Sequence, residues 1–253
     1  MIWDQLTTEE LAQVDRSSVV ILPLAATEQH GPHLPLATDR WIAEGICQSI
    51  EARLSERVLI LPAPPVGYSA HHRAFPGTLS VTHQILIDYA RGLLECVLSD
   101  GFQNLFILNA HGGNIALTGV LQESLGEAFP TARIAACSWW QAAAKELLEL
   151  SESGPGGVGH ACELETSLIL HLHPDAVRQE EIAPGTNVPT HAWAESDMLR
   201  ASPVRLHRSL SQMTRNGVFG NPGNASAEKG ARILAAVLNA LVPVLNDLYA
   251  TTS

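Results

Sequence analysis

Four side chains that can bind a metal ion lie close together near the beginning of the chain. The stretch LAATEQHGPHLPLATDRW (24–41) contains Glu28, His30, His33 and Asp39 directly after an apolar run. Carboxylates and imidazoles in one group suit a divalent ion such as zinc, manganese or iron. The alternative is a polar loop in which Asp39 only caps the following helix and Glu28 is solvated. The position of the whole group at the end of a predicted buried strand favours a metal site.

A second group of polar residues follows a later apolar run. The stretch NAHGGN (109–114) presents His111 beside two glycines, which let a backbone approach a ligand closely. Asn114 can cap the helix predicted to begin there, and it is a candidate donor to a substrate carbonyl. A phosphate-binding loop is the competing interpretation, but the stretch fits neither GxGxxG nor GxxxxGK[ST]. We therefore treat His111 as a candidate ligand.

The third group is HACELETS (160–167), at the beginning of a predicted helix. On a helix, His160 and Glu163 are neighbours at spacing i, i+3, whereas Glu165 points well away from Glu163. Carboxylates in an otherwise apolar helix are costly unless they pair or bind a metal. His72, in the loop before FPGT, is a weaker candidate for the lining of the same site. The sequence has no GxSxG or SxxK nucleophile motif, so metal-activated water is the expected nucleophile.

Short apolar strands and helices alternate along the front half of the chain. This alternation predicts a mostly parallel sheet with helices on both faces. Ligands of such sheets bind at the carboxyl ends of the strands, so Glu28 and His111 should lie at the same edge. Strands are predicted at 17–24, 57–64, 104–114 and 132–138, and helices from Thr38 to about residue 54 and at 83–99, 114–128 and 160–174.

The back half is less regular. The composition of SESGPGGVG (151–159) is typical of a flexible linker or lid. Residues 175–223 show little periodicity, and a loop of that length is expected to be a substrate lid or an arm between subunits. A long amphipathic helix is predicted from about Asn224, with a kink or break near Pro243.

The composition of the chain limits the classes of partner that it is expected to bind. The chain has 253 residues and a net charge of −11, which argues against nucleic acid and against an anionic membrane surface. The four cysteines are scattered and are interpreted as reduced thiols. The N-terminus lacks the pattern of a signal peptide, and no apolar run reaches the roughly 18 residues that span a bilayer. We expect a single domain over 1–253 and a cytoplasmic location.

Taken in order, the motifs TEQHGPHLPLATD, FPGTLS, NAHGGN, HACELETS and GVFGNPGNASAEKG closely resemble the creatininase (creatinine amidohydrolase) family. The resemblance implies a dinuclear metal hydrolase on a three-layer α/β/α sandwich, assembled as a hexamer built from dimers. By position, Glu28 and His111 would hold one metal and His30 the other, with Asp39 between them. His160 matches a histidine beside the bound substrate, which is a candidate general acid–base.

The chain departs from creatininase proper at the metal site and at the substrate site. The turn that reads HYE in creatininase carries a glutamate ligand, and Gly113 takes its place here. We expect Glu163 to substitute as the ligand and Glu165 and His33 to support the site from outside. Gly156 replaces a tryptophan beside the substrate, although Trp140 matches a second one. The loss of this aromatic side chain at the substrate site argues against creatinine as the substrate.

The resulting hypothesis is hydrolysis of a C–N bond of a small cyclic amide or related non-peptide substrate, with two divalent ions, zinc first and manganese or iron as alternatives. A formamide deformylase or a peptidase of the same family would use the same residues. A non-catalytic metal-binding or assembly protein is the alternative from another class, and a nucleotide-binding module is a third.

Overall fold

The computed structural model describes residues 1–195, 197–200, 202 and 204–250. In these residues, four parallel strands form one sheet in the order β2-β1-β3-β4. The strands are β1 (Val19–Leu24), β2 (Val58–Ile60), β3 (Asn104–Asn109) and β4 (Arg133–Ser138). The helices are α1 (Thr8–Gln13), α2 (Thr38–Leu54), α3 (His83–Ser99), α4 (Ile115–Ala128), α5 (Trp139–Ala142), α6 (Ala144–Leu150), α7 (Glu163–Leu172), α8 (Leu210–Met213) and α9 (Ala227–Ala250).

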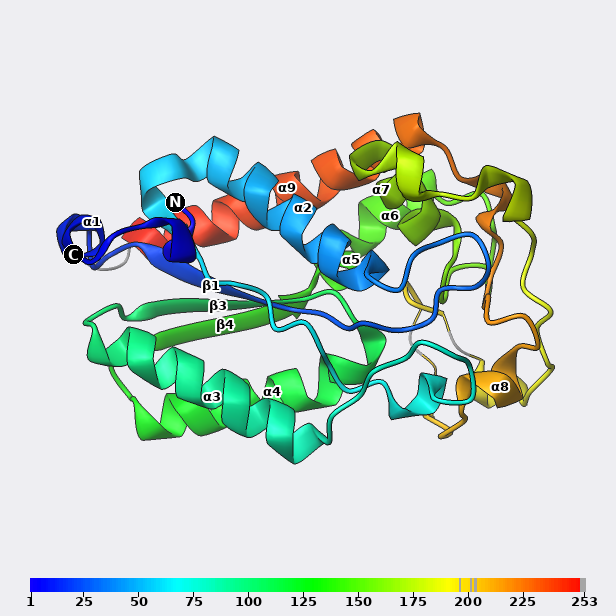
Figure 1. Ribbon diagram of the computed structural model, residues 1–253, viewed down its shortest axis with the longest axis horizontal. Helices are drawn as coiled ribbons and strands as arrows, with labels where there is room; N and C mark the ends of the chain where they lie inside the picture. Colours follow the sequence, from blue (N-terminus) through cyan, green and yellow to red (C-terminus); the bar gives the residue numbers. More distant parts are fainter. Residues whose placement is uncertain (196, 201, 203, 251–253) are drawn as a thin grey trace.

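Helices cover both faces of the sheet. Figure 1 shows α2, α7 and α9 on one side and α3 and α4 on the other, which confirms the predicted α/β/α sandwich. Two hydrophobic cores result, and β1 supplies both because its side chains alternate between the faces. Val19 and Ile21 belong to the core beneath α2, α7 and α9, whereas Val20 and Leu22 belong to the core beneath α3 and α4.

Three strands end at the same level. Leu24 is paired with Asn109, and Asn109 with Ser138. The segments that follow β1, β3 and β4 therefore leave the sheet side by side at the carboxyl edge. This register brings together parts of the chain that are far apart in sequence, as the strand order predicts for a ligand site.

Several predicted boundaries differ from the observed ones. Strand β2 is shorter than 57–64. Helix α7 begins at Glu163 rather than at residue 160, because His160 lies in a short backbone bridge to Phe219. Helix α9 continues past Pro243 to Ala250, so the predicted break does not occur.

Helix α9 is long and apolar enough to cross a membrane, but it packs here as a core helix. Its side chains Ile233, Val237 and Leu241 are buried in the core shared with α2 and α7. This packing accounts for part of its hydropathy, since 33% of its most apolar 18-residue window is buried.

The glycine-rich segment 151–159 is held in place by hydrogen bonds. The Gly157 carbonyl accepts from the Asn221 amide at 3.1 Å, and the Gly156 amide donates to the Asp197 carboxylate at 2.8 Å. Hydrogen bonds thus join this segment to residues 197 and 221, far along the chain.

Candidate metal centre

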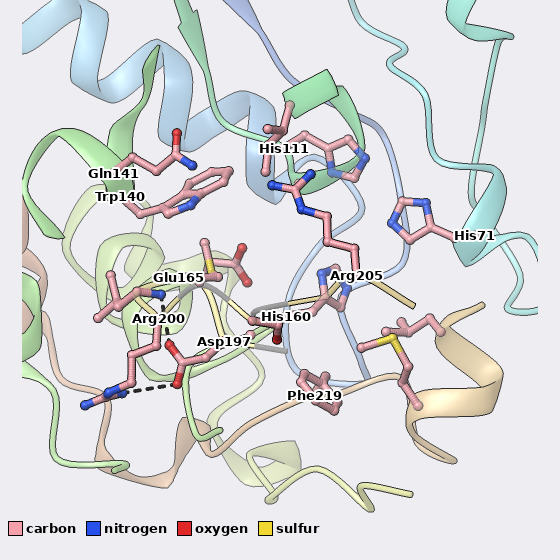
Figure 2. Close-up of a pocket in the computed structure, with 18 of the residues that line it drawn as sticks. His71, His111, Trp140, Gln141, His160, Glu165, Asp197, Arg200, Arg205 and Phe219 are labelled. Carbon is pink, nitrogen blue, oxygen red and sulfur yellow. Dashed lines mark hydrogen bonds and ion pairs between the residues drawn. The ribbon is translucent and has the colours of Figure 1, made fainter. Parts of the chain in front are cut away.

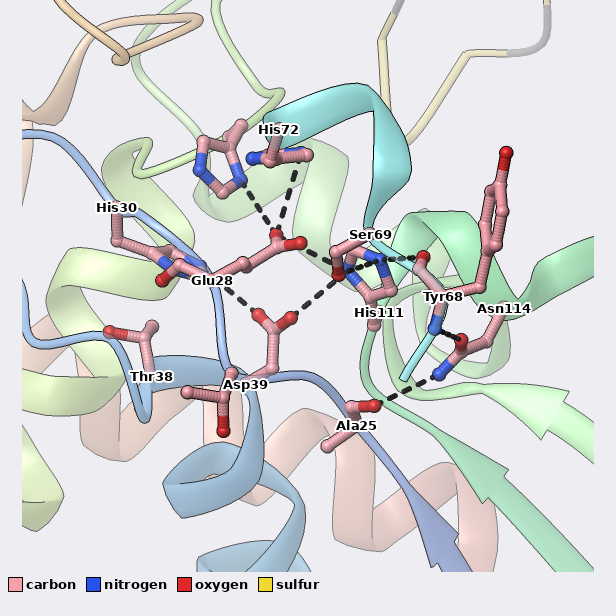
Figure 3. Close-up of polar contacts among 12 residues, drawn as sticks. Ala25, Glu28, His30, Thr38, Asp39, Tyr68, Ser69, His72, His111 and Asn114 are labelled. Carbon is pink, nitrogen blue, oxygen red and sulfur yellow. Dashed lines mark hydrogen bonds and ion pairs between the residues drawn. The ribbon is translucent and has the colours of Figure 1, made fainter. Parts of the chain in front are cut away.

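Three segments of the chain deliver polar side chains to one point at the carboxyl edge of the sheet. Glu28 and His30 lie in the loop after β1, Asp39 in the first turn of α2, and His111 directly after β3. Figure 3 shows the carboxylates of Glu28 and Asp39 turned toward the ring of His111. No side chain caps the N-terminus of α2, so Asp39 serves the cluster rather than its own helix.

The first set of candidate ligands is Glu28, Asp39 and His111. Nδ1 of His111 lies 3.2 Å from Oε1 of Glu28 and 3.0 Å from Oδ2 of Asp39. All three side chains are buried. One ligand atom from each lies close enough to the others to surround a single ion.

The second set shares Asp39. Nε2 of His30 lies 3.1 Å from Oδ1 of Asp39 and 4.0 Å from Oε2 of Glu165. His160 joins His30 and Glu165 in a group of metal-binding geometry, and its Nδ1 lies 3.5 Å from Glu28. The two oxygens of Asp39 thus face one histidine each, as a bridging carboxylate would.

The buried polar atoms of these side chains are unsatisfied. Among the described residues, Oε1 and Oε2 of Glu28, Nε2 of His30, Oδ2 of Asp39 and Oε2 of Glu165 have no hydrogen-bond partner. Leaving such atoms without a partner costs about 1–3 kcal/mol each, and more for charged groups. A cation in their midst would satisfy them together, so these residues fit a metal site.

Neighbouring carbonyl groups set the histidine tautomers. His111 donates from Nε2 to the Tyr68 carbonyl at 2.9 Å, and His30 donates from Nδ1 to the Glu28 carbonyl at 3.1 Å. His160 donates from Nε2 to the Gln29 carbonyl at 2.6 Å. In its neutral form, each ring would therefore turn its unprotonated nitrogen to the cluster, which is the arrangement that metal-binding histidines need.

The charges of the cluster shift its pKa values in opposite directions. Burial alone would lower the pKa of His30, but the carboxylates, Asp39 first, raise it to about 9. The carboxylates outweigh burial at His111 as well, and its pKa lies well above the usual range. Burial and the proximity of His30 hold the pKa of His160 well below its usual value. Burial raises the pKa of Glu165 to about 7. Without a metal ion, protons thus provide positive charge at the cluster.

Glu163 does not join the cluster, so the expectation that it completes the second metal set is wrong. Its carboxylate pairs with Nζ of Lys229 and accepts from the hydroxyls of Ser151 and Ser153. Residues two apart on a helix point about 200° apart. Because α7 begins at Glu163, that residue faces α9, and Glu165 faces His30. Glu165, and not Glu163, is therefore the glutamate of α7 that could hold a metal ion.

The residues expected to support the site or bind the substrate lie in the pocket wall, beside the cluster, or outside the pocket. Trp140, buried at the start of α5, lines the pocket over the cluster. Nε2 of His72 lies 3.5 Å from Glu28, and that of His33 lies 2.9 Å from the Thr166 hydroxyl behind the cluster. Asn114 neither caps its helix nor reaches the pocket. Its amide instead binds the Ala25 carbonyl and the Tyr68 amide, which holds two loops together.

Gln29 is the functional residue that the motifs did not indicate. Its side-chain amide nitrogen donates to Nδ1 of His72 at 3.2 Å and to the Gly217 carbonyl. Nε2 of His160 lies 3.0 Å from the same nitrogen, but it carries its own proton and cannot accept from it. The side-chain oxygen accepts from the Gly31 amide. With its nitrogen fixed toward His72, Gln29 leaves His72 protonated at Nε2, toward Glu28. An amide next to a ligand carries no sequence signal of this role.

A pocket of about 780 Å³ opens onto the cluster. Glu28, Asp39, His111, His160 and Glu165 contribute to its lining, and Trp140 and Phe219 contribute aromatic surface (Figure 2). Part of the long segment 175–223 supplies the opposite wall, including Ala194, Met198, Leu199 and Leu206. That part of the segment therefore lines the pocket, a position that both the lid and the subunit-arm interpretations allow.

Comparison with known proteins places this geometry in a family. The family model for creatininase, described as creatinine amidohydrolase, matches residues 4–245. The chain belongs to the creatininase family. This family membership and the names of the relatives identify it as a hydrolase.

Relatives within the creatininase family carry different names. The mycofactocin precursor peptide peptidase of Mycobacterium tuberculosis is 33% identical over 88% of this chain and 82% of its own length. The 3-dehydro-scyllo-inosose hydrolase of Thermotoga maritima is 26% identical over 95% of this chain and 79% of its own. The solved structure "Creatininase Mn" is 22% identical, with a TM-score of 0.82 over 97% of both chains, which shows the shared fold.

Proposed function

We propose that this creatininase-family protein is a two-metal hydrolase that cleaves an amide C–N bond. The observation that carries the proposal is the set of unsatisfied carboxylate oxygens and imidazole nitrogens at the base of the pocket. Glu28, Asp39 and His111 would hold one ion, and His30, Asp39 and Glu165 the other. Zinc is our first expectation, with manganese and iron as alternatives, and solved creatininases of manganese and zinc type support the first two.

A divalent ion held by such ligands supplies Lewis acidity and lowers the pKa of a coordinated water from about 16 to about 7. His160 is placed to move protons, because its Nδ1 faces Glu28 while Nε2 is fixed by the Gln29 carbonyl. Its lowered pKa keeps the ring neutral, so Nδ1 can accept a proton from water. When the C–N bond breaks, the same proton passes to the leaving nitrogen, and the products are a carboxylate and an amine.

The pocket favours a peptide-like amide over the small cyclic amide expected from the sequence. A pocket of about 780 Å³ lies in the upper part of the usual range for ligand sites, and a single small ring would leave most of it empty. The relationship to a peptide peptidase, at 33% identity, supports the same choice.

The test begins with metal content. Purified protein should bind two ions per chain, and removal of the ions by a chelator should abolish hydrolysis in a panel of short peptides, formamides and creatinine. Asp39→Asn should lose both ions and activity, whereas Asp88→Asn, an exposed acid on α3, should lose neither. Full activity in chelated protein would refute metal catalysis. Two bound ions without hydrolysis of any amide would favour the non-catalytic alternative.

Cytoplasmic location, hexameric assembly, and the absence of nucleic-acid and membrane partners stay predictions from sequence. Size-exclusion chromatography with light scattering checks the assembly. A mass other than six chains would reject it.

A further inference from the structure

The wall of the pocket opposite the candidate metal ligands carries two arginines, Arg200 and Arg205. The rest of that wall is largely apolar, with Met198, Leu199 and Leu206 among its residues. Both arginines are exposed to solvent, so each charge is hydrated in the empty pocket and is available to an anion unless a protein carboxylate already pairs with it. The two arginines differ in whether the protein supplies one.

Arg200 is neutralised by the protein. Its Nη1 lies 3.1 Å from Oδ2 of Asp197, whose side chain is 6% exposed. Asp197 also accepts from the amides of Gly156, at 2.8 Å, and Leu199, at 2.9 Å. The pair thus fastens the wall to the glycine-rich segment and offers no charge to a ligand.

Arg205 has no such partner in the described part of the chain, where no carboxylate lies within ion-pair distance of it. Figure 2 shows its guanidinium group directed inward, toward the space bounded by His111, His71 and Trp140. The acids that line the pocket are Glu28, Asp39, Glu165 and Asp197. The first three belong to the metal sets and the fourth to Arg200, so none is left to balance Arg205.

The charge that the pocket would have with both metal ions bound favours an anionic ligand. Three carboxylates do not neutralise two divalent ions, so the base of the pocket is positive when both ions are bound. Arg205 adds a further positive charge within the same cavity. The whole chain, in contrast, has a net charge of −11. An anion that enters this pocket therefore meets a local field opposite to that of the protein as a whole.

We propose that Arg205 binds a carboxylate of the substrate, and that the substrate is the C-terminal end of a peptide with an apolar residue there. The planar guanidinium matches a carboxylate with two parallel hydrogen bonds. The apolar wall residues and Trp140 would contact the neighbouring side chain while the scissile amide lies over the ligands at the base. This substrate class rests on the proposed amide hydrolysis and adds the group by which the pocket recognises its substrate.

Binding to the zinc-loaded protein tests the proposal without requiring turnover. The probes are N-acetyl-glycyl-phenylalanine and the same compound with a C-terminal amide, titrated by calorimetry. The acid should bind about tenfold or more tightly than the amide, since hydrogen bonds to charged groups are worth that much. Arg205→Gln should reduce the ratio to near one, and Arg205→Lys should keep part of it. Arg215→Gln, an exposed arginine of the same segment outside the pocket, should keep all of it.

Three outcomes would overturn the assignment of Arg205. The first is equal binding of acid and amide by the unsubstituted protein. The second is an undiminished preference for the acid in Arg205→Gln, because the carboxylate would then bind the metal ions directly. The third is no binding of either probe. A preference for the acid that depends on Arg205, in a protein that hydrolyses no amide, would refute the proposed reaction and leave the carboxylate site standing.

Discussion

Replacing Lys229 by methionine tests the role that the structure gives to Glu163. Lys229 is 6% exposed, and its Nζ contacts the buried carboxylate of Glu163, the carboxylate of Glu152 at 2.8 Å and the carbonyl of Asn224 at 2.7 Å. The side chain of Glu152 is 69% exposed, so its contact adds little. The pair with Glu163 is the contact that matters for stability.

The expected loss follows from what remains around Glu163. Removing one partner of a buried ion pair costs about 3–5 kcal/mol. Glu163 keeps hydrogen bonds from the Ser151 and Ser153 hydroxyls and from the amides of Glu152 and Ser153. These donors still stabilise its charge, so we expect the lower end, about 3 kcal/mol. For a chain of this length that loss lowers the melting temperature by about 6–12 °C.

Thermal unfolding and metal analysis of the parent protein and four variants test this role of Glu163. Lys229→Met should melt early, and Lys145→Met, an exposed lysine on α6, should not. Adding Glu163→Gln to Lys229→Met should cost less than the two single losses together, because it removes the charge left without a partner. Glu163→Gln alone should keep the full metal content. Loss of a metal ion in Glu163→Gln, or a melting temperature for Lys229→Met within about 2 °C of the parent, would refute this account.

Two further predictions concern the histidines. Gln29→Leu should keep both metal ions and lower kcat by about 10- to 100-fold, the usual effect of losing a group that orients a site residue, because His72 loses the amide donor at its Nδ1. Unchanged kcat would contradict the tautomer assignment of His72. Metal affinity should rise with pH between about 6.5 and 9, since a metal must displace protons from His30, whose pKa is about 9 in the metal-free protein, and from His111. Calorimetry in buffers of different ionisation enthalpy would measure the released protons, and zero release at pH 7.5 would contradict the pKa assignments.

The sequence predicted best what depends on short-range pattern. The apolar runs located the strands, and parallel strand order placed Glu28 and His111 at one edge. It predicted poorly what depends on the phase of a helix. His160 lies before α7, in the bridge with Phe219, so the i, i+3 spacing that predicted His160 and Glu163 on one helical face does not apply. Nothing local to residue 163 indicates that its partner lies 66 residues later in the chain.

The same limit applies to amide side chains. Asn114 has the position of a helix cap and the chemistry of a substrate donor, yet its hydrogen bonds join two loops. Gln29 looks like an ordinary loop residue and contacts two histidines of the site. An amide group can donate and accept in any direction, so only the fold decides which partners it takes.

Gly113 limits how the metal site can change in evolution. A Cβ atom at this residue would lie 2.2 Å from the Tyr68 carbonyl and 2.5 Å from Nε2 of His111. That carbonyl is the acceptor that orients His111, so a side chain at 113 would displace the partner of a candidate ligand. The substitution Gly113→Glu alone would therefore not produce the creatininase arrangement, which has a glutamate in this turn. A lineage moving between the two arrangements would have to rebuild the segment around Tyr68 first, and the same order of steps applies to anyone who redesigns the site.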